Sequence, residues 1–267
     1  MLIVDDTRER RGLADRRDGG KRLAELTEAI EHGQVEILFQ PQFASVDTAL
    51  VGAEALARWD HPRLGRIGAE ALFDIAQRCG RAAELTSHIA LRALAIAAGW
   101  PGHLRLSLNI TPADLADDNF ANTILAALTV ADFDPRRLTL EITEQALVTE
   151  LDRSERQLER LVRRGIRIAL DDFGAGFCNF RYLKRLPLQV LKLDRSMVQG
   201  TVDDERDLAV LRGILAMARA LDLTVVAEGI ETEQQRATIV REGCEKWQGF
   251  LGGAPMTALD FSAFAAR

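Results

Sequence analysis

The sequence has few of the residues that build disulfide frameworks and zinc sites. Its three cysteines, Cys79, Cys178 and Cys244, are scattered and odd in number, and its four histidines do not cluster. No cysteine pair has the spacing of metal ligands, so neither a disulfide framework nor a zinc site is predicted. A metal bound by this chain would be held by oxygen atoms, which favours Mg²⁺ or Mn²⁺. The cysteine pattern also favours a reducing, cytoplasmic setting.

Long apolar segments are also missing. No stretch reaches about 18 uninterrupted apolar residues, so no transmembrane helix is predicted. The apolar run over Met1 to Val4 is too short for a signal peptide. The net charge of −6 and the sequence pI of about 5.4 give no support for binding to polymeric nucleic acid or to a membrane surface.

The remaining composition is that of an ordinary globular protein. The chain has 267 residues, of which 47% are hydrophobic and 28% charged. This length fits either two small domains or one α/β barrel of about 250 residues. Residues 1–22 are crowded with charge and interrupted by glycines, which predicts a linker or the tail of an upstream regulatory domain. The folded domain is expected over 23–267.

Strand-like apolar segments alternate with helical patterns along this domain. Such alternation predicts a mainly parallel sheet. Eight strands in one domain favour a closed (β/α)₈ barrel of the TIM type, with a doubly wound open sheet as the alternative. The segment after the second strand, from Asp60 to Gly65, is expected to be a loop, and the alanines of that strand would also permit a helix. The predicted strands cover 35–41, 50–59, 104–109, 138–144, 166–172, 189–194, 223–229 and 244–249.

The chain is organised around the stretch from Ile166 to Gly176. A buried strand is predicted to end there in two adjacent carboxylates, Asp171 and Asp172, followed by a Gly-x-Gly loop. Two neighbouring acids repel each other, and a divalent cation removes that repulsion. The glycines let the backbone turn sharply. Taken alone, an Asp-Asp pair is better explained by a strand-to-helix turn in which one Asp caps the next helix.

Other predicted strands end in polar residues as well, and in a barrel these ends converge on one face. Five of the acids, at positions 54, 141, 171, 172 and 228, carry five negative charges and Lys192 one positive charge, so two divalent cations would neutralise this group. Two metal ions about 3.5–4 Å apart form a clamp for phosphoryl transfer. Asn109 offers a neutral oxygen ligand, and Lys192 can neutralise charge or orient the attacking water. We therefore predict metal-assisted hydrolysis of a phosphate ester. The residues at the strand ends are Gln40, Glu54, Asn109, Glu141, Asp171, Asp172, Lys192, Asp194, Glu228 and Gln248.

The ordered set of motifs resembles the EAL-domain cyclic di-GMP phosphodiesterases from about Leu23 to the end. The Glu-Ala-Leu triplet at 54–56 alone would mean little, but the set recurs in order across all eight strands. The motifs are FQP at 39–41, EALARW at 54–59, Asn109, LEITE at 140–144, DDFGAG at 171–176, LKLD at 191–194, AEGIE at 227–231 and QGF at 248–250.

The resemblance implies a TIM-type barrel with one antiparallel strand that hydrolyses cyclic di-GMP to linear pGpG with two Mg²⁺ or Mn²⁺ ions. It implies three catalytic residues: Lys192 beside the attacking water, Glu228 and Glu54. It further implies a loop over 171–180 that Glu144 anchors and Glu231 supports. The implied metal ligands are Glu54, Asn109, Glu141, Asp171, Asp172 and Glu228. The implied substrate contacts are Gln40, Leu56, Arg58, Asp194, Gln248 and Pro255.

The chain departs from the family pattern at a few positions, none of which removes a metal ligand. Ala175 stands where threonine is frequent, Cys178 and Asn179 replace two serines, and Gly252 to Ala254 is less bulky than usual. These departures bear on loop stability and turnover rate. The alternatives are a related domain that binds cyclic di-GMP as a receptor without cleaving it, and a different metal phosphodiesterase on the same barrel. The chain also contains the Asp-Phe-Gly triplet of protein kinases. It has neither the glycine-rich nucleotide loop nor the His-Arg-Asp catalytic loop of kinases, so a kinase is not predicted.

Aromatic residues gather just after the acid pair, at Phe177, Phe180 and Tyr182, in a chain that is only 6% aromatic. They would either pack into the outer layer of the barrel itself or form a contact between two chains. The family resemblance favours the second use, because EAL domains often pair through the helix that follows this loop. We therefore expect a homodimer.

Overall fold

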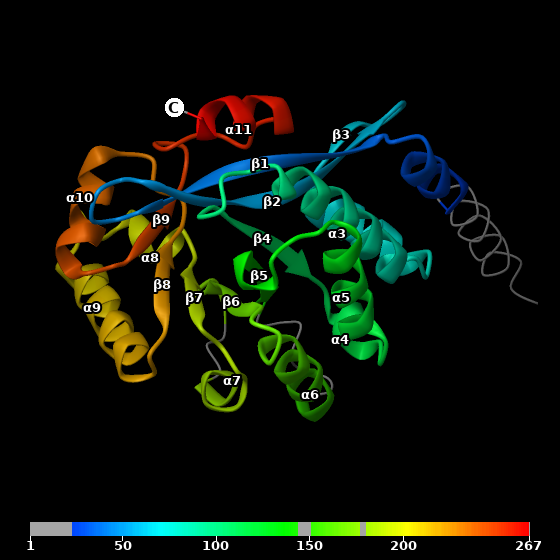
Figure 1. Cartoon of the computed structure of the whole chain (residues 1–267). Coiled ribbons are helices and arrows are strands. Elements are labelled where there is room, and N and C mark those ends of the chain that lie inside the picture. The colour runs from blue at the N-terminus through cyan, green and yellow to red at the C-terminus, as the bar shows by residue number, and fades with distance from the viewer. Residues whose placement is uncertain (1–22, 144–150, 177–179, 267) are drawn as a thin grey trace, which may run out of the picture.

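The structure is a computed structural model that describes residues 23–143, 151–176 and 180–266. Within these ranges, a helix over 23–31 leads into a barrel of alternating strands and helices (Figure 1). No helix of the described residues has the length and apolar character needed to cross a membrane.

Eight strands close the barrel, as predicted, and the open-sheet alternative is wrong. The sheet order is β1-β9-β8-β7-β6-β5-β4-β2-β3, and an additional pairing of β1 with β2 joins the two sides. The first strand is antiparallel to both of its neighbours, whereas the other strands of the ring pair in parallel, and β3 extends β2 as a hairpin. The strands are β1 (Val35–Ala44), β2 (Leu50–His61), β3 (Gly65–Ile67), β4 (Arg105–Ile110), β5 (Leu138–Thr143), β6 (Arg167–Phe173), β7 (Val190–Leu193), β8 (Thr224–Ala227) and β9 (Lys246–Gln248).

Helices surround the ring, and α11 lies across β1, where the ring of Phe261 packs 5.9 Å from that of Phe39 (Figure 1). The helices are α2 (Ala69–Arg78), α3 (Ala82–Ala98), α4 (Pro112–Ala116), α5 (Phe120–Val130), α6 (Leu151–Val162), α7 (Phe180–Arg185), α8 (Ser196–Gln199), α9 (Glu205–Ala220), α10 (Glu233–Glu242) and α11 (Ala258–Ala265).

Two separate apolar layers show which way the strand residues face. Leu106, Ile168 and Leu170 belong to the large core between the sheet and the helices. Ala169, Val190 and Val226 form a small cluster of their own inside the barrel. Because side chains alternate along a strand, every second residue of β4 to β9 points inward. This alternation turns the polar residues at the ends of these strands toward the inside of the barrel.

Several predicted boundaries are wrong. Pro41 does not end β1, because it falls between the bridge of Phe39 to Met256 and the first β9 pair at Gln42, where its missing N–H costs no ladder bond. Asp60 and His61 belong to β2, since they pair with β3 in a hairpin. The short elements β3, α4 and α8 were not predicted because three to five residues show no periodicity.

Candidate active site

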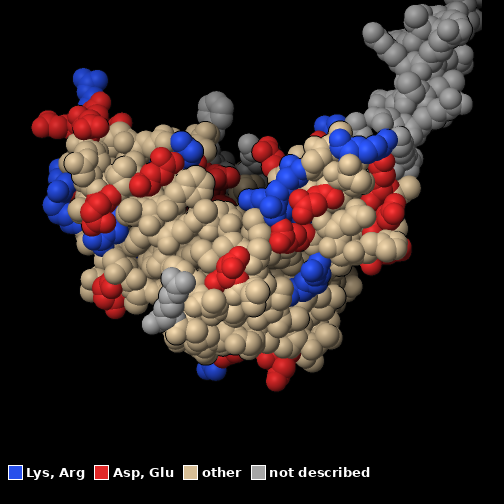
Figure 2. Space-filling view, turned by 90° about the horizontal axis from the view of Figure 1, so that it is seen from above, with Lys and Arg blue, Asp and Glu red and all other residues tan. Residues whose placement is uncertain are grey.

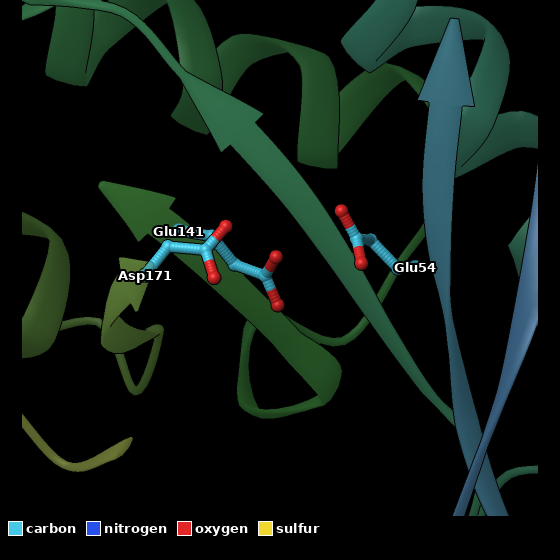
Figure 3. Close-up of side chains that lie close together, drawn as sticks. All are labelled: Glu54, Glu141 and Asp171. Carbon is cyan, nitrogen blue, oxygen red and sulfur yellow. The ribbon is translucent and has the colours of Figure 1, made fainter. Parts of the chain in front are cut away.

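Carboxylates from three strands point toward one another at the carboxyl ends of the parallel strands (Figure 3). Glu54 comes from β2, Glu141 from β5 and Asp171 from β6. All three are at most 7% exposed. Each can offer an oxygen within 4.8 Å of the others, and Asp171, Asp172 and Glu228 form a second such group. We call the five acids Glu54, Glu141, Asp171, Asp172 and Glu228 the acid cluster.

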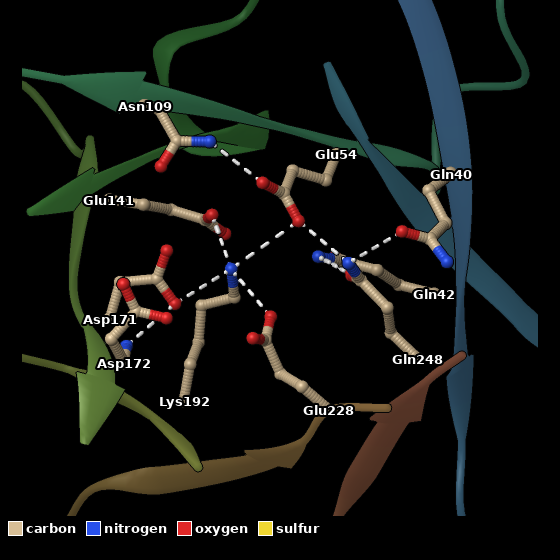
Figure 4. Close-up of polar contacts among 10 residues, drawn as sticks. All are labelled: Gln40, Gln42, Glu54, Asn109, Glu141, Asp171, Asp172, Lys192, Glu228 and Gln248. Atoms are coloured by element: carbon tan, nitrogen blue, oxygen red, sulfur yellow. Dashed lines mark hydrogen bonds and ion pairs between the residues drawn. The ribbon is translucent and has the colours of Figure 1, made fainter. Parts of the chain in front are cut away.

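The ammonium group of Lys192 lies in the middle of the acid cluster (Figure 4). Its Nζ atom is 2.5 Å from Glu141 Oε2 and 3.0 Å from Asp171 Oδ1. It is also 2.8 Å from Glu228 Oε1 and 3.4 Å from Glu54 Oε2. The side chain is only 1% exposed. Burial disfavours the charged amine, but the surrounding acids outweigh it and hold the pKa of Lys192 well above its ordinary value.

Amide groups fix the orientation of Glu54. Asn109 Nδ2 donates to Glu54 Oε1 at 2.7 Å, and Gln248 Nε2 donates to Glu54 Oε2 at 2.6 Å. Gln248 is held by Gln42, which donates to its Oε1 at 3.0 Å, and Gln248 Nε2 also lies 3.2 Å from Gln40 Oε1. Burial raises the pKa of Glu54, but Lys192 and these amide hydrogen bonds lower it below its ordinary value. Glu54 is therefore the acid that stays ionised most readily.

The other four acids resist ionisation. Burial is the largest cause for each, and like charges nearby add to it. The pKa of Glu141 lies well above its ordinary value, and that of Glu228 rises to about 8. A single ammonium group does not balance this set of carboxylates. A donor set of oxygens alone suits Mg²⁺ or Mn²⁺, so the described residues fit the predicted metals.

Asp172 has an unusual backbone conformation. Its φ angle is 55°, in the left-handed region, and its N–H donates to Asp171 Oδ1 at 3.0 Å. The turn is closed by the N–H of Ala175, which donates to the carbonyl of Asp172 at 3.1 Å. Left-handed backbone is costly for a residue with a side chain and is frequent at functional sites. Here this conformation places the carboxylates of Asp171 and Asp172 together at the rim of the barrel.

A cleft of about 920 Å³ opens above the acid cluster. Its lining includes the side chains that the sequence placed at strand ends, among them Gln40, Asn109 and Gln248. Phe73, Thr111 and Tyr182 also line it. Phe73 belongs to α2 and Thr111 caps α4, so neither is among the predicted strand-end residues. An adjoining hollow of about 200 Å³ is lined by Asp194, Glu231 and Phe250 and shares Gln40, Glu228 and Gln248 with the cleft.

The remaining predicted residues lie elsewhere. Leu56, Arg58 and Pro255 are not among the described residues that line the two cavities. Arg58 is half-buried and its Nη1 donates to the carbonyl of Ala57 at 2.8 Å. Their proposed contacts to substrate stay predictions. Glu144, Phe177 and Cys178 lie outside the described residues.

Charge on the outer surface is mixed. On the face shown in Figure 2, acidic and basic side chains lie among one another around a broad uncharged area. Lys and Arg side chains form no continuous basic stripe among the described residues of that face. The absence of binding to polymeric nucleic acid stays a prediction.

The fold and this site define a TIM-type barrel with an acid cluster suited to divalent cations. The sequence profile of the EAL domain matches residues 23–255, and the chain therefore belongs to the EAL-domain family. Among its relatives, MucR of Pseudomonas aeruginosa, a bifunctional diguanylate cyclase/cyclic di-GMP phosphodiesterase, is 34% identical over 248 residues. That match covers 91% of this chain and 36% of MucR.

A second relative and a solved structure agree with this assignment. NbdA, a cyclic di-GMP phosphodiesterase of Pseudomonas aeruginosa, is 36% identical over 240 residues, which are 87% of this chain and 30% of NbdA. The structure of PaMucR phosphodiesterase in complex with c-di-GMP superimposes with a TM-score of 0.83 at 33% identity, covering 90% of this chain and 99% of that chain. The chain spans about a third of the length of these curated relatives.

Proposed function

We propose that this chain is a metal-dependent phosphodiesterase that hydrolyses cyclic di-GMP to linear pGpG. One observation carries the proposal: the acid cluster is complete and surrounds a buried lysine at the floor of an open cleft. The names of the relatives MucR and NbdA support the choice of substrate.

Two Mg²⁺ or Mn²⁺ ions, when bound, would activate water and neutralise charge on the attacked phosphate. The chain offers oxygen ligands on five strand ends for them. Asp171 belongs to both groups of acids, so it would help to hold the ions at either group. The residues proposed to hold the ions are Glu54, Asn109, Glu141, Asp171, Asp172 and Glu228.

Three side chains have further proposed roles at the cleft floor. Lys192 keeps a fixed positive charge beside the reacting phosphate and water, where it opposes developing negative charge. Glu228 lines both cavities, so its carboxylate can take up a proton from the attacking water. Gln248 is held in place by Gln42 and Gln40, and it keeps Glu54 oriented.

The deciding experiment is incubation of the purified chain with cyclic di-GMP and Mg²⁺, followed by product chromatography. Appearance of pGpG supports the proposal. Saturable binding of cyclic di-GMP without any product would contradict it and would indicate the receptor alternative. Hydrolysis of other phosphodiesters at equal rates would indicate a different metal phosphodiesterase.

The setting of the domain is also a proposal. We expect a cytoplasmic homodimer controlled by an upstream regulatory domain, to which residues 1–22 would connect. The large share of each relative that lies outside its match supports additional domains. The exposed ring of Phe180, which is 59% accessible at the start of α7, supports a contact with a second chain.

A further inference from the structure

Three basic side chains lie at the end of the barrel opposite the acid cluster. Arg105 begins β4, Arg167 begins β6 and Lys246 begins β9. Because side chains alternate along a strand, each shares the inward face of its strand with a cleft residue farther along. These cleft residues are Asn109, Asp171 and Gln248.

A layer of small and mostly apolar side chains separates the two ends of the barrel. Ala169, Val190 and Val226 pack together inside the ring, and Ser107 and Thr139 are likewise almost fully buried. We call these five residues the interior plug. The three basic residues lie on the far side of this plug from the acid cluster, so they belong to a different site.

The three cations repel one another. Burial first, and then repulsion from Arg167 and Arg105, lowers the pKa of Lys246 to about 8. Burial and repulsion from Arg167 also lower the pKa of Arg105, against a smaller opposing effect of Asp134. All three side chains are half-buried, so they share a confined space that solvent still reaches.

None of the three has an anionic partner among the described residues. No ion pair joins any of them to a carboxylate, and no hydrogen bond of the Arg167 or Lys246 side chain is found within the described ranges. Arg105 donates to a neutral group, the carbonyl of Arg136, at 2.5 Å. Like charges held together without a counter-ion are costly. Just as the acid cluster favours bound cations, these three basic side chains favour a bound anion.

The carboxylates whose charge acts on these cations, Asp134 on Arg105 and Glu245 on Lys246, are already engaged. Asp134 accepts hydrogen bonds from the guanidinium of Arg136, whose Nη2 lies 2.8 Å from Asp134 Oδ2. Glu245 accepts from the backbone N–H of Val225 at 2.8 Å. Neither acid lies within ion-pair distance of the three basic groups, so the positive charge at this end of the barrel is only partly offset.

We propose that Arg105, Arg167 and Lys246 form a binding site for a small oxyanion of the size of inorganic phosphate. Guanidinium groups donate in a fork that matches the oxygens of a phosphate, and an ammonium group adds a point charge. The overall charge of the chain is −6, so such binding would reflect this local cluster and not general attraction of anions.

The test is equilibrium dialysis of the metal-free chain against phosphate, with ionic strength held constant by NaCl. Chelator is present so that no metal at the acid cluster attracts the anion. We expect saturable binding of about one phosphate per chain. Removing one of the charges, in Lys246→Met or Arg167→Met, should weaken binding at least about tenfold, because a charged hydrogen bond to the anion is lost.

Arg163→Met is the matched control, because Arg163 is 68% exposed on the surface and pairs only weakly with Glu159 at 3.8 Å. It should bind phosphate as the wild type does. Absence of saturable binding to the wild type would overturn the proposal. Equal affinity of the wild type and whichever of the two charge variants folds would also overturn it. Thermal unfolding gives a second readout: phosphate should raise the Tm of the wild type and not that of the two variants.

Discussion

Lys192 Nζ lies 2.8 Å from Glu228 Oε1, and this contact joins the barrel's only described buried lysine to the one member of the acid cluster that lines both cavities. Replacement of Lys192 by Met keeps the volume of the side chain and removes the charge. We expect turnover to fall by about 10²–10⁴, the range found for groups that assist proton transfer or charge stabilisation. The variant should still bind Mn²⁺, because no ligand oxygen is lost.

Product chromatography and Mn²⁺ titration on the same sample check this prediction. Lys184→Met is the control, since Lys184 is exposed on α7 and should leave turnover unchanged. Near-normal turnover of the Lys192 variant would show that its charge is not used in the reaction. Loss of Mn²⁺ binding would instead indicate that the Lys192 ammonium group serves to hold the metal ligands in position.

Much of the site could be predicted because each strand is an apolar run that ends in a polar residue. Leu140 followed by Glu141, and Leu170 followed by Asp171, show this pattern directly. Parallel strands bring such ends together at one face, so convergence follows once the barrel is predicted. The one antiparallel strand came from the family resemblance, since alternation alone favours a fully parallel ring.

The contacts within the site could not be predicted. Gln42 lies near the end of β1, and nothing in its neighbours in sequence indicates that it holds Gln248, 206 positions away. The central place of Lys192 likewise depends on distances across the ring. Phe73 reaches the cleft from α2, and a helical pattern does not reveal which exposed residue faces an opening.

The second prediction concerns metal removal. Excess chelator should abolish turnover, and Mg²⁺ or Mn²⁺ should restore it, because the donor set contains only oxygens. Ca²⁺ should bind and inhibit, since its larger and more flexible coordination shell does not reproduce the required geometry. Rates measured with each ion after dialysis check this. Full activity in chelator would exclude the proposed metal mechanism.

The third prediction concerns the pH dependence of stability in the metal-free chain. The pKa of Glu228 is about 8 in the folded state, above its ordinary value in an unfolded chain. The folded state therefore binds the extra proton in the window between these values. The contribution of Glu228 to stability is fully present below the pKa of this group in the unfolded chain. It is lost as the pH rises through the pKa of the group in the folded state.

We therefore expect the Tm of the wild type to fall relative to that of Glu228→Gln between pH 5.5 and 7.5. The free-energy difference should change by at most about 1.4 kcal/mol per pH unit. Lys192 does not oppose this change, because its raised pKa keeps it charged throughout. Comparison with the Gln variant cancels titrating groups outside the acid cluster, such as His88, whose pKa is lowered mainly by burial. Parallel Tm curves for the two proteins would contradict the assignment to Glu228.

The last prediction concerns Phe180 and assembly. The predicted aromatic group is divided in the structure, because Tyr182 is only 6% exposed and packs in the barrel's own core, whereas Phe180 is 59% exposed. Only Phe180, of these two, is free to contact another chain. It begins α7, which follows the turn that carries Asp171 and Asp172. A dimer contact at Phe180 would restrain that turn, so specific activity should rise as the dimer forms.

Sedimentation and specific activity are measured over the same concentration series for wild type and Phe180→Ser. The substitution should weaken the dimer, and it should shift the rise in specific activity to higher concentration by the same factor. Val210→Ser, which removes a 52% exposed apolar side chain from α9, should alter neither curve. If the wild type sediments as a monomer with constant specific activity, assembly has no part in ordering the acid pair, and the turn must hold Asp171 and Asp172 through its own hydrogen bonds.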